Sequence, residues 1–320
     1  MGTLLTDYVR VDANNRCPIC GHDTWCLIAR NGRSVICPRT KSERQYKKAG
    51  YFHPLAAGTI PPVPKAEPPL RLSPKNVRRH FDRLGIVDPR PFAQHAATLK
   101  LPVEALEYFG TRYDGASAAL AFPMYSNINQ MVGVRFRRQD GKKWSLKGGS
   151  NGLFLGPHHD SRIPIIVTEG PTDGAAAVAS GFRRVIGRPF CYGGQEELIR
   201  YVTATNSPNT PVIILSDPNE VGIEGSRKLA YGLRAPTIVL CHNVDVRRYF
   251  ITKNTNLLED VIRAVLGDCS DWKVLFRNMH YATQATTPEF LHTLITRLDP
   301  AFAIEYLKSP ALCQSNLTNI

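Results

Sequence analysis

Residues 163–182, IPIIVTEGPTDGAAAVASGF, open with an apolar run that ends at Glu169 and continue into a helical stretch. Two further apolar runs, 212–216 and 237–240, follow with a second helical stretch between them. Continuous apolar strands that alternate with helices are typical of a parallel sheet covered by helices. This part of the sequence therefore predicts an α/β fold.

Acidic residues stand at the ends of the predicted strands. Glu169 ends the first strand, Asp217 follows the second, and Asp245 lies shortly after the third. Sites in open α/β sheets form beyond the carboxyl ends of the strands, so Glu169 and Asp217 are expected to meet there. The dipole of a following helix would explain a single acid. Repelling carboxylates at two neighbouring strand ends instead predict a Mg²⁺ site that orients phosphates.

The segment 120–156 alternates apolar and polar residues around turn signals at 127–129 and 140–141, which predicts β-hairpins. Arg135 and Arg137 share one face of their strand, because side chains alternate, and form a stripe that can follow a phosphate backbone. A solvated edge strand is the alternative explanation. The basic residues of the stretch, which also holds Trp144, are Arg135, Arg137, Arg138, Lys142, Lys143 and Lys147.

Upstream of the hairpins, Ser73 and Pro74 form a helix start, and a second short helix follows Pro102. AAGTIPPVPKAEPPL, residues 56–70, is rich in Pro and Ala and predicts a semi-rigid linker. The chain after 250 is expected to be helical, with an apolar face over 257–265 and a last helix that begins at Thr287 and Pro288 and runs through Tyr306.

Four cysteines in the first 40 residues have the spacing C-x2-C-x5-C-x10-C: Cys17, Cys20, Cys26 and Cys37. Four thiolates complete a closed tetrahedral zinc site, whose binding energy supplies folding energy. His22 as fourth ligand in place of Cys26, and free buried cysteines, remain alternatives. The scattered Cys191, Cys241, Cys269 and Cys313 are expected to be buried thiols.

Aromatic and basic residues surround this cysteine cluster, namely Trp25, Arg30, Arg33 and Arg39. Base stacking combined with phosphate contacts would suit single-stranded nucleic acid. A solvated basic face explains the same arginines equally well. The sequence therefore leaves the nucleic-acid role of this module open.

The whole chain is basic, with 40 Lys+Arg against 27 Asp+Glu and a formal charge of +13. This balance favours polyanionic partners such as nucleic acid. The sequence has no apolar run of roughly 20 residues and no apolar signal segment at its start. We therefore expect a cytoplasmic protein.

Several of these stretches resemble known motifs. IPIIVTEGPTDGAAAVASGF looks like the first motif of the Toprim fold, a strand that ends in Glu-Gly with an Asp three residues after the Gly. VIILSDPNEVGIEG, residues 212–225, looks like the second motif, and VDVRRYF, residues 244–250, resembles the segment after the third strand in primase members. The basic stretch 120–156 and the CPICG segment are similar to two further modules of phage- and bacterial-type DNA primases.

The resemblance implies an α/β fold with a Toprim-type parallel sheet flanked by helices. A mixed α+β basic subdomain and a small zinc ribbon-like module would precede it. The expected domains are a zinc-binding module (1–53), a Pro-rich linker (54–72), a basic N-terminal primase subdomain (73–160), a Toprim domain (161–250) and a C-terminal helical segment (251–320).

The resemblance also implies residue roles. Glu169 would be a metal ligand or general acid/base, Asp217 would hold magnesium, and Asp173 would support the site or a second metal. Asn219 stands where the family has a second Asp; as a neutral amide it is a weaker magnesium ligand, and Glu220 could substitute for it. The implied magnesium ligands are Glu169, Asp217 and Asn219, and the implied channel for template and nucleotide is lined by Arg135, Arg137, Lys142, Lys143 and Lys147.

The implied function is template-directed synthesis of short RNA primers on single-stranded DNA from ribonucleoside triphosphates, with Mg²⁺ or Mn²⁺ at the acids and Zn²⁺ at the cysteines. A Toprim nuclease remains an alternative, as does a nucleic-acid-binding replication accessory protein with a weak or inactive site, which Asn219 favours. The sequence contains no G-x-x-x-x-G-K-[ST] motif, so a replicative helicase would be a separate partner unless the chain is a fragment.

Overall fold

The computed structural model describes residues 7–46, 49–56, 71–84, 89–157, 160–207, 210–253, 257–266, 269, 271–277 and 294–299. The chain divides into two compact units, Met1–Pro69 and Leu70–Ile320, and most of the predicted linker lies outside the described residues. None of the helices in the described ranges has the length and apolar character that crossing a membrane requires.

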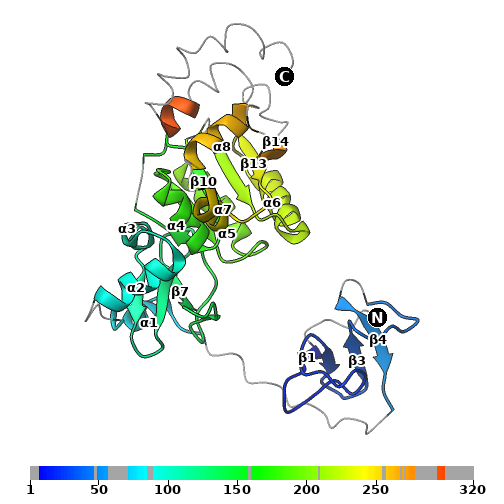
Figure 1. The fold of residues 1–320 in the computed structure, drawn as a ribbon. Helices are drawn as coiled ribbons and strands as arrows, with labels where there is room; N and C mark the ends of the chain where they lie inside the picture. Colours follow the sequence, from blue (N-terminus) through cyan, green and yellow to red (C-terminus); the bar gives the residue numbers. More distant parts are fainter. Residues whose placement is uncertain are drawn as a thin grey trace. The chain divides into compact units, whose positions relative to one another are not determined.

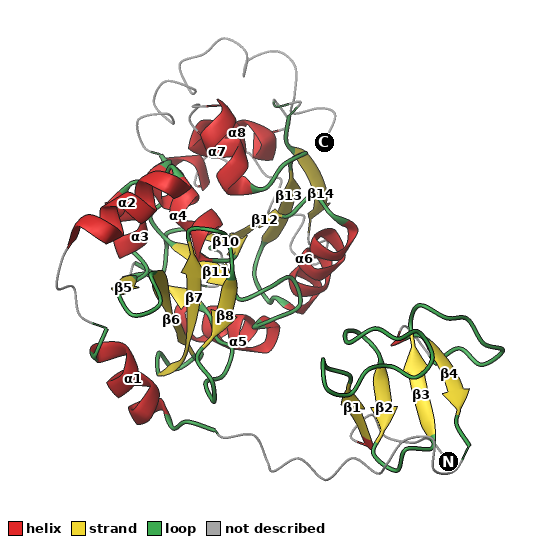
Figure 2. Cartoon of the chain, turned by 60° about the horizontal axis from the view of Figure 1, so that its bottom comes forward, coloured by secondary structure: helices red, strands yellow, loops and turns green. Residues whose placement is uncertain are grey.

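The first unit is a small antiparallel sheet. Its strands, β1 (Tyr8–Arg10), β2 (Leu27–Ala29), β3 (Ser34–Cys37) and β4 (Tyr51–Pro54), pair in chain order (Figure 2). Ile28 and Val35 are fully buried between the cysteines. A core of this size stabilises little by itself, which is why such modules need a metal or disulfides.

The second unit contains a six-stranded sheet in the order β14-β13-β12-β10-β11-β9. The four central strands, β13 (Thr237–Cys241), β12 (Val212–Ser216), β10 (Ile165–Glu169) and β11 (Val185–Arg188), are parallel. The edge strands β9 (Phe154–Leu155) and β14 (Lys273–Arg277) are antiparallel to their neighbours. The prediction of a parallel sheet is thus confirmed for its centre and wrong for its edges.

Helices cover both faces of this sheet (Figure 1). Alternate residues of the central strands enter two different cores, as the period of two requires. Ile165, Val167 and Ile214 pack against α5 (Gln195–Thr205) and α6 (Glu220–Gly232). Ile166 and Ile213 belong to the core on the other face. Helices α4 (Pro171–Ala179), α7 (Val246–Lys253) and α8 (Leu257–Leu266) contribute to that core.

A second antiparallel sheet precedes the large one in sequence. Its strands are β5 (Arg112–Asp114), β6 (Ala119–Tyr125), β7 (Met131–Arg138) and β8 (Lys143–Ser145), so the predicted hairpin turns are confirmed. The helices of this region are α1 (Pro74–Asp82), α2 (Pro89–Leu99) and α3 (Val103–Glu107), of which α2 was not predicted. Ser73 caps α1 as expected, since its side chain accepts from the backbone N–H of Asn76.

The two faces of this second sheet differ. Val134 and Phe136 of β7 pack against α1. Arg135 and Arg137 point to the opposite face, where they pair across the ladder with Phe122 and Leu120 of β6. Leu120 and Phe122 belong to the core that contains α4, so the two arginines share the face that meets the large sheet's domain.

The segment after residue 250 is only partly helical. Helix α8 carries the predicted apolar face, but β14 adds a strand beside β13, so the expectation of an all-helical tail is wrong. Residues 278–293 and 300–320 lie outside the described residues, and with them the predicted helix start at Thr287 and also Cys313.

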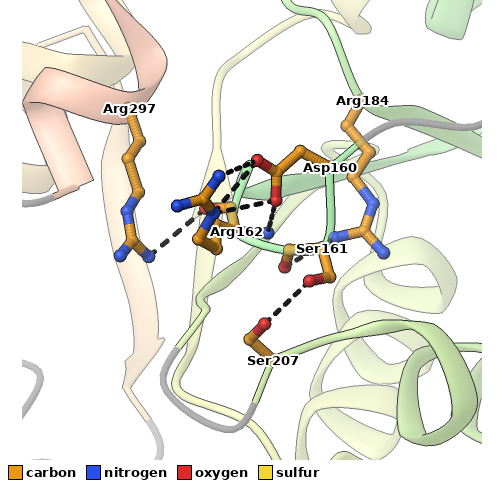
Figure 3. Close-up of polar contacts among 6 residues, drawn as sticks. All are labelled: Asp160, Ser161, Arg162, Arg184, Ser207 and Arg297. Carbon is orange, nitrogen blue, oxygen red and sulfur yellow. Dashed lines mark hydrogen bonds and ion pairs between the residues drawn. The ribbon is translucent and has the colours of Figure 1, made fainter.

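A buried arginine ties together the edge of the large sheet that is formed by the amino ends of its parallel strands (Figure 3). Arg184 Nη1 donates to the carbonyl oxygens of Ser161 and Ile163 and to Oδ1 of Asn206. The hydroxyls of Ser161 and Ser207 lie 2.9 Å apart in the same network. These bonds fix the loop before β10 to the end of α5, so β10 leaves a rigid base and carries Glu169 to the opposite edge.

Candidate active site

Four carboxylates gather at the carboxyl ends of the parallel strands. Glu169 ends β10, Asp217 follows β12, Asp245 precedes α7, and Asp173 lies in the first turn of α4. Strands β10 and β12 are neighbours in the sheet, as predicted. All four side chains line one hollow of about 290 Å³.

Close packing of α6 holds the first two acids in place. A Cβ at Gly222 would lie 2.8 Å from the Cβ of Asp217 and 3.0 Å from Oε1 of Glu169, so only glycine lets the helix approach this near. A hydrogen bond fixes the neighbouring Asp173 instead: its Oδ1 accepts from the backbone N–H of Arg247 at 3.1 Å. The carboxylates are therefore fixed before any ligand arrives.

Burial and mutual repulsion raise the pKa values of these acids. Burial, followed by the charge of Asp217, raises the pKa of Glu169 to about 7, although Arg188 opposes the shift. Burial raises the pKa of Asp173 to about 7 as well, with the charges of Asp245 and Asp217 adding to the effect. Burial and Asp245 also raise the pKa of Asp217. Such a cluster is electrostatically unfavourable until a proton or a cation neutralises it.

The residues fit a divalent cation. Glu169 Oε1 and Asp217 Oδ1 are buried and have no hydrogen-bond partner within the described part of the chain. Carboxylate oxygens are the ligands that Mg²⁺ prefers, and a divalent ion would satisfy the Asp217 oxygen, whereas the Glu169 oxygen already lies 3.6 Å from Nη2 of Arg188. The arrangement therefore offers a magnesium or manganese site in which Asp173 and Asp245 are further donors.

Basic side chains line the same hollow. Arg135 and Arg137 of β7, Lys143 of β8 and Arg247 of α7 line it together with the acids. Burial lowers the pKa of Arg137, and the nearby charge of Arg247 lowers it further. Guanidinium groups held this way match the bidentate geometry of phosphates. The hollow thus combines cation ligands with phosphate donors.

Aromatic side chains complete the lining, which includes Phe122, Phe154 and Phe190. The first two are buried, whereas Phe190, in the loop between β11 and α5, is 47% exposed. An exposed ring at the rim of a phosphate-binding hollow can stack on a base.

Only some of the site residues that the sequence predicted line the hollow. It brings together Glu169, Asp173 and Asp217 with Arg135, Arg137 and Lys143. Lys142 and Lys147 are exposed and are not among the described residues that line the hollow. Asn219 is not among them either; it is the N-cap of α6, and its Oδ1 accepts from the backbone N–H of Gly222 at 2.8 Å. Their predicted binding roles stay predictions.

Sequence reasoning assigned no role to three residues that belong here. Asp245 was noted after the third strand without a role, and Arg247, two residues later in VDVRRYF, could have been found with it. Arg188, which contacts Glu169, ends the strand β11 that was not predicted. Nothing in its sequence neighbourhood distinguishes it from a surface arginine.

The cysteine cluster of the first unit has the geometry of a zinc site. The Sγ atoms of Cys17, Cys20, Cys26 and Cys37 all lie within 4.8 Å of one another. Cys26 Sγ is 3.6 Å from Cys20 Sγ and 3.7 Å from Cys37 Sγ. A tetrahedron with Zn–S bonds of about 2.3 Å has an S–S edge of about 3.8 Å, so the thiols fit Zn²⁺.

The predicted turn of this site is also present. Gly21 has a φ of 72°, and its N–H donates to the carbonyl oxygen of Cys17 at 2.8 Å. Cys26 completes the cluster, and His22, the alternative ligand, is not part of it. Four protein ligands leave no open position, which makes the site structural.

The aromatic and basic residues of this unit divide into two groups. Trp25 is 67% exposed, and the guanidinium of Arg10 lies 5.7 Å from the centre of its ring. Arg39 instead donates to the carbonyl oxygen and the hydroxyl of Thr24, so it braces the loop between two of the cysteines. Trp25 is therefore free to stack on a base, whereas Arg39 is occupied in holding the module together.

Comparison with solved structures finds DnaG-type primases. The zinc-binding and RNA polymerase domains of the Aquifex aeolicus primase align over 98% of this chain and 92% of that chain, with a TM-score of 0.45 and 12% identity. The DnaG catalytic core aligns over 73% of this chain and 94% of its own length, with a TM-score of 0.44 and 12% identity. The primase fragment of the bacteriophage T7 primase-helicase protein aligns over 79% of this chain and 98% of its own length, with a TM-score of 0.40 and 13% identity.

No family model and no curated protein matches the chain. Since the TM-scores lie below 0.5, we infer the function below from the residues of the chain itself.

Proposed function

We propose that the chain is a DNA primase that joins ribonucleoside triphosphates on a single-stranded DNA template. One observation carries the proposal: the acids Glu169, Asp173, Asp217 and Asp245 line a single hollow together with basic residues of β7 and β8. A site for a divalent cation beside phosphate donors is what nucleotidyl transfer needs. The domain that holds the acids would be of the Toprim type.

Each part of the hollow has a role in this reaction. Mg²⁺ or Mn²⁺, when bound by the carboxylates, would neutralise and orient the triphosphate. Arg135, Arg137 and Lys143 would pair with phosphate oxygens and stabilise the charge that develops as the 3′-hydroxyl attacks the α-phosphate and pyrophosphate leaves. Glu169, whose pKa is raised to about 7, is suited to take the proton of that hydroxyl.

The zinc unit would contribute to template binding. The exposed ring of Trp25 and the guanidinium of Arg10 offer a stacking surface next to a positive charge. The formal charge of +13 for the whole chain adds non-specific attraction to DNA. A replicative helicase would be supplied by another polypeptide or by a further part of the same protein.

Metal-dependent nucleotide binding tests this proposal. We expect a fluorescent ribonucleoside triphosphate analogue to bind the zinc-loaded chain only when Mg²⁺ or Mn²⁺ is present. Asp217→Asn should weaken binding by about tenfold or more, since it removes a cation ligand. Arg137→Ala should weaken it by about tenfold, because a charge-assisted phosphate contact is lost. The matched controls, Glu196→Gln and Arg234→Ala, change exposed residues outside the hollow and should bind like wild type.

A nuclease and a non-enzymatic accessory protein give different results. A nuclease would shorten end-labelled single-stranded DNA in the presence of Mg²⁺ without any need for nucleotides. An accessory protein, the alternative that the neutral cap residue Asn219 favours, would bind DNA but no triphosphate. Nucleotide binding that is independent of divalent ions and of Asp217 would contradict the primase proposal.

A further inference from the structure

Arg188 is a fully buried charge behind the acidic row, which consists of Asp245, Asp217 and Glu169 at or after the strand ends. It ends β11, and the strand register pairs it with Glu169 of β10, so the two side chains leave the sheet on the same face. Its side chain is 0% exposed, and its Nη2 lies 3.6 Å from Oε1 of Glu169. Arg188 is not among the described residues that line the hollow, so it acts on the site through Glu169.

The guanidinium of Arg188 is held in place from two sides. Its Nη1 donates to the carbonyl oxygen of Cys191 at 2.7 Å. Helix α6 presses on that same peptide group, because a Cβ at Gly225 would lie 2.4 Å from the Cys191 oxygen. Glu169 lies on the other side, next to Nη2. The positive charge therefore stays at this end of the row whether or not a ligand is present.

Sheet order places the charges in sequence along one edge. From β13 to β11 the residues at or after the strand ends are Asp245, Asp217, Glu169 and Arg188. A fixed cation thus stands at one end, and three carboxylates, with Asp173 of α4 beside them, extend away from it. A divalent ion is repelled by the guanidinium and gains most at the end that is farthest from it.

A second feature lowers the negative charge of the site. Asn219, in the turn after Asp217, is neutral, and its Oδ1 is already engaged by the backbone N–H of Gly222. A carboxylate in this position would have added one negative charge next to Asp217. The buried arginine adds a positive charge, and the neutral amide adds no negative one. Both therefore reduce the number of divalent ions that are needed to neutralise the carboxylates.

We propose that Arg188 serves as a built-in cation that holds Glu169, so that the site takes a single divalent ion, bound by Asp173, Asp217 and Asp245. This inference rests on the proposed function and narrows it: Glu169 positions or reacts with substrate and is not a ligand of the ion. Arg188 is a positioning residue, since it touches Glu169 and not the contents of the hollow.

Manganese stoichiometry tests the inference without any need for catalysis. Mn²⁺ binding to the zinc-loaded full chain is measured by the loss of the free-ion signal in electron paramagnetic resonance. We expect one Mn²⁺ for each wild-type chain. Asp217→Asn should weaken that site by about tenfold or more, whereas Glu169→Gln should change its affinity by less than about threefold.

Replacement of the arginine completes the test. Arg188→Met removes the charge and keeps much of the volume, so we expect a second Mn²⁺ to bind at the Glu169 end of the row. Arg188→Lys keeps the charge and should bind one ion. If Arg188→Met does not fold, the double variant Glu169→Gln/Arg188→Met leaves no unpaired buried charge and should still bind one ion.

The outcomes separate this inference from the proposed function. One Mn²⁺ that depends on Asp217 and not on Glu169 supports the inference, even if no RNA is made. Two ions in wild type, no ion at all, or equal loss of binding in Glu169→Gln and Asp217→Asn would overturn it, even in a chain that synthesises primers.

Discussion

Glu169 shows how one residue can carry opposing influences. Burial and the charge of Asp217 favour its protonated form, while the guanidinium of Arg188, 3.6 Å away, favours the carboxylate. The balance leaves its pKa at about 7, against an ordinary value of 4.5. Glu169 therefore changes charge near neutral pH, so small changes in its surroundings alter its protonation.

The raised pKa values predict how stability depends on pH. The folded state holds protons on Glu169 and Asp173 up to about pH 7, whereas the unfolded chain releases them at its ordinary pKa values. The free energy of unfolding should therefore be highest below about pH 4.5 as far as these groups decide it, and should fall as the pH rises to about 7. Thermal unfolding of the zinc-loaded chain in buffers free of other divalent ions measures this.

The same groups predict a pH-dependent effect of metal. Mn²⁺ should raise the melting temperature more at about pH 8 than at about pH 5.5, because the acids are ionised only at the higher pH. Without Mn²⁺, Glu169→Gln should reduce the pH dependence of the melting temperature, whereas the exposed control Glu196→Gln should leave that pH dependence unchanged. A melting temperature that rises between about pH 5 and 7 through these residues would contradict the assignment.

Phe190 gives a prediction about base stacking. Its ring is 47% exposed at the rim of the hollow, and Tyr231 on α6, 74% exposed, is a matched aromatic control outside it. Phe190→Ala should weaken binding of nucleotide or single-stranded DNA by about tenfold, the loss expected for one stacked base. Tyr231→Ala should leave binding unchanged in the same fluorescence titration. Equal effects of the two substitutions would remove Phe190 from the site.

At the scale of elements, helix α6, which follows strand β12, packs closely against the acids. The helix starts at the Asn219 cap and passes the acids with Gly222, then passes Cys191 with Gly225. Glycine in a helix costs about 1 kcal/mol relative to alanine, so the presence of Gly222 and Gly225 in the first two turns of α6 needs a local reason. The reason is the close approach of the helix backbone to the acids and to the peptide that holds Arg188.

Gly222→Ala tests that reason. If helix propensity decided the outcome, the substitution would stabilise the chain; we expect the reverse, because the added Cβ would lie 2.8 Å from Asp217 and 3.0 Å from Glu169. The melting temperature should fall, and the affinity for Mn²⁺ should drop by about tenfold as the acids move. Gly115→Ala is the control, since no heavy atom lies within 4 Å of its added Cβ.

The cysteine module predicts a metal-dependent fold. Its four strands have three or four residues each and enclose few apolar side chains, so zinc must supply much of its stability. Chelation should unfold this unit while the unit with the six-stranded sheet keeps its own unfolding transition in calorimetry. Cys26→Ser should lower the zinc content below one per chain, and His22→Ala should leave it at one. Zinc loss in His22→Ala would contradict the four-cysteine site.

At the scale of the whole molecule, the order of modules and the main acids could be predicted from sequence. The apolar runs at 163–169 and 212–216 and the acids after them are local patterns, and local patterns survive folding. The edge strands β9 and β14 could not be predicted, because β9 has only two residues and β14, KVLFR, has a charged residue at each end of a short apolar run. The partner of Glu169 was missed for a related reason: arginine is rarely buried, so VIGR does not read as a strand that ends in an interior charge.

The basic half shows the same division between local and distant information. Alternation correctly placed Arg135 and Arg137 on one face, but only the packing of β6 on the core around α4 turns that face toward the acids. Lys142 and Lys147 belong to the same charge run and stay at the surface outside the hollow. Charge in the sequence therefore predicts the partner class, while tertiary packing decides which charges meet it.

The most direct test of the account is de novo RNA synthesis on single-stranded DNA with Mg²⁺ or Mn²⁺ and labelled ribonucleoside triphosphates. We predict short products from the wild-type chain, and from Glu196→Gln at an equal rate. Glu169→Gln should reduce the rate by at least about a hundredfold, the range expected for loss of a general base. Synthesis that survives in Glu169→Gln, or no synthesis by a wild-type chain that binds both DNA and nucleotide, would contradict the claim that this acidic row joins ribonucleotides.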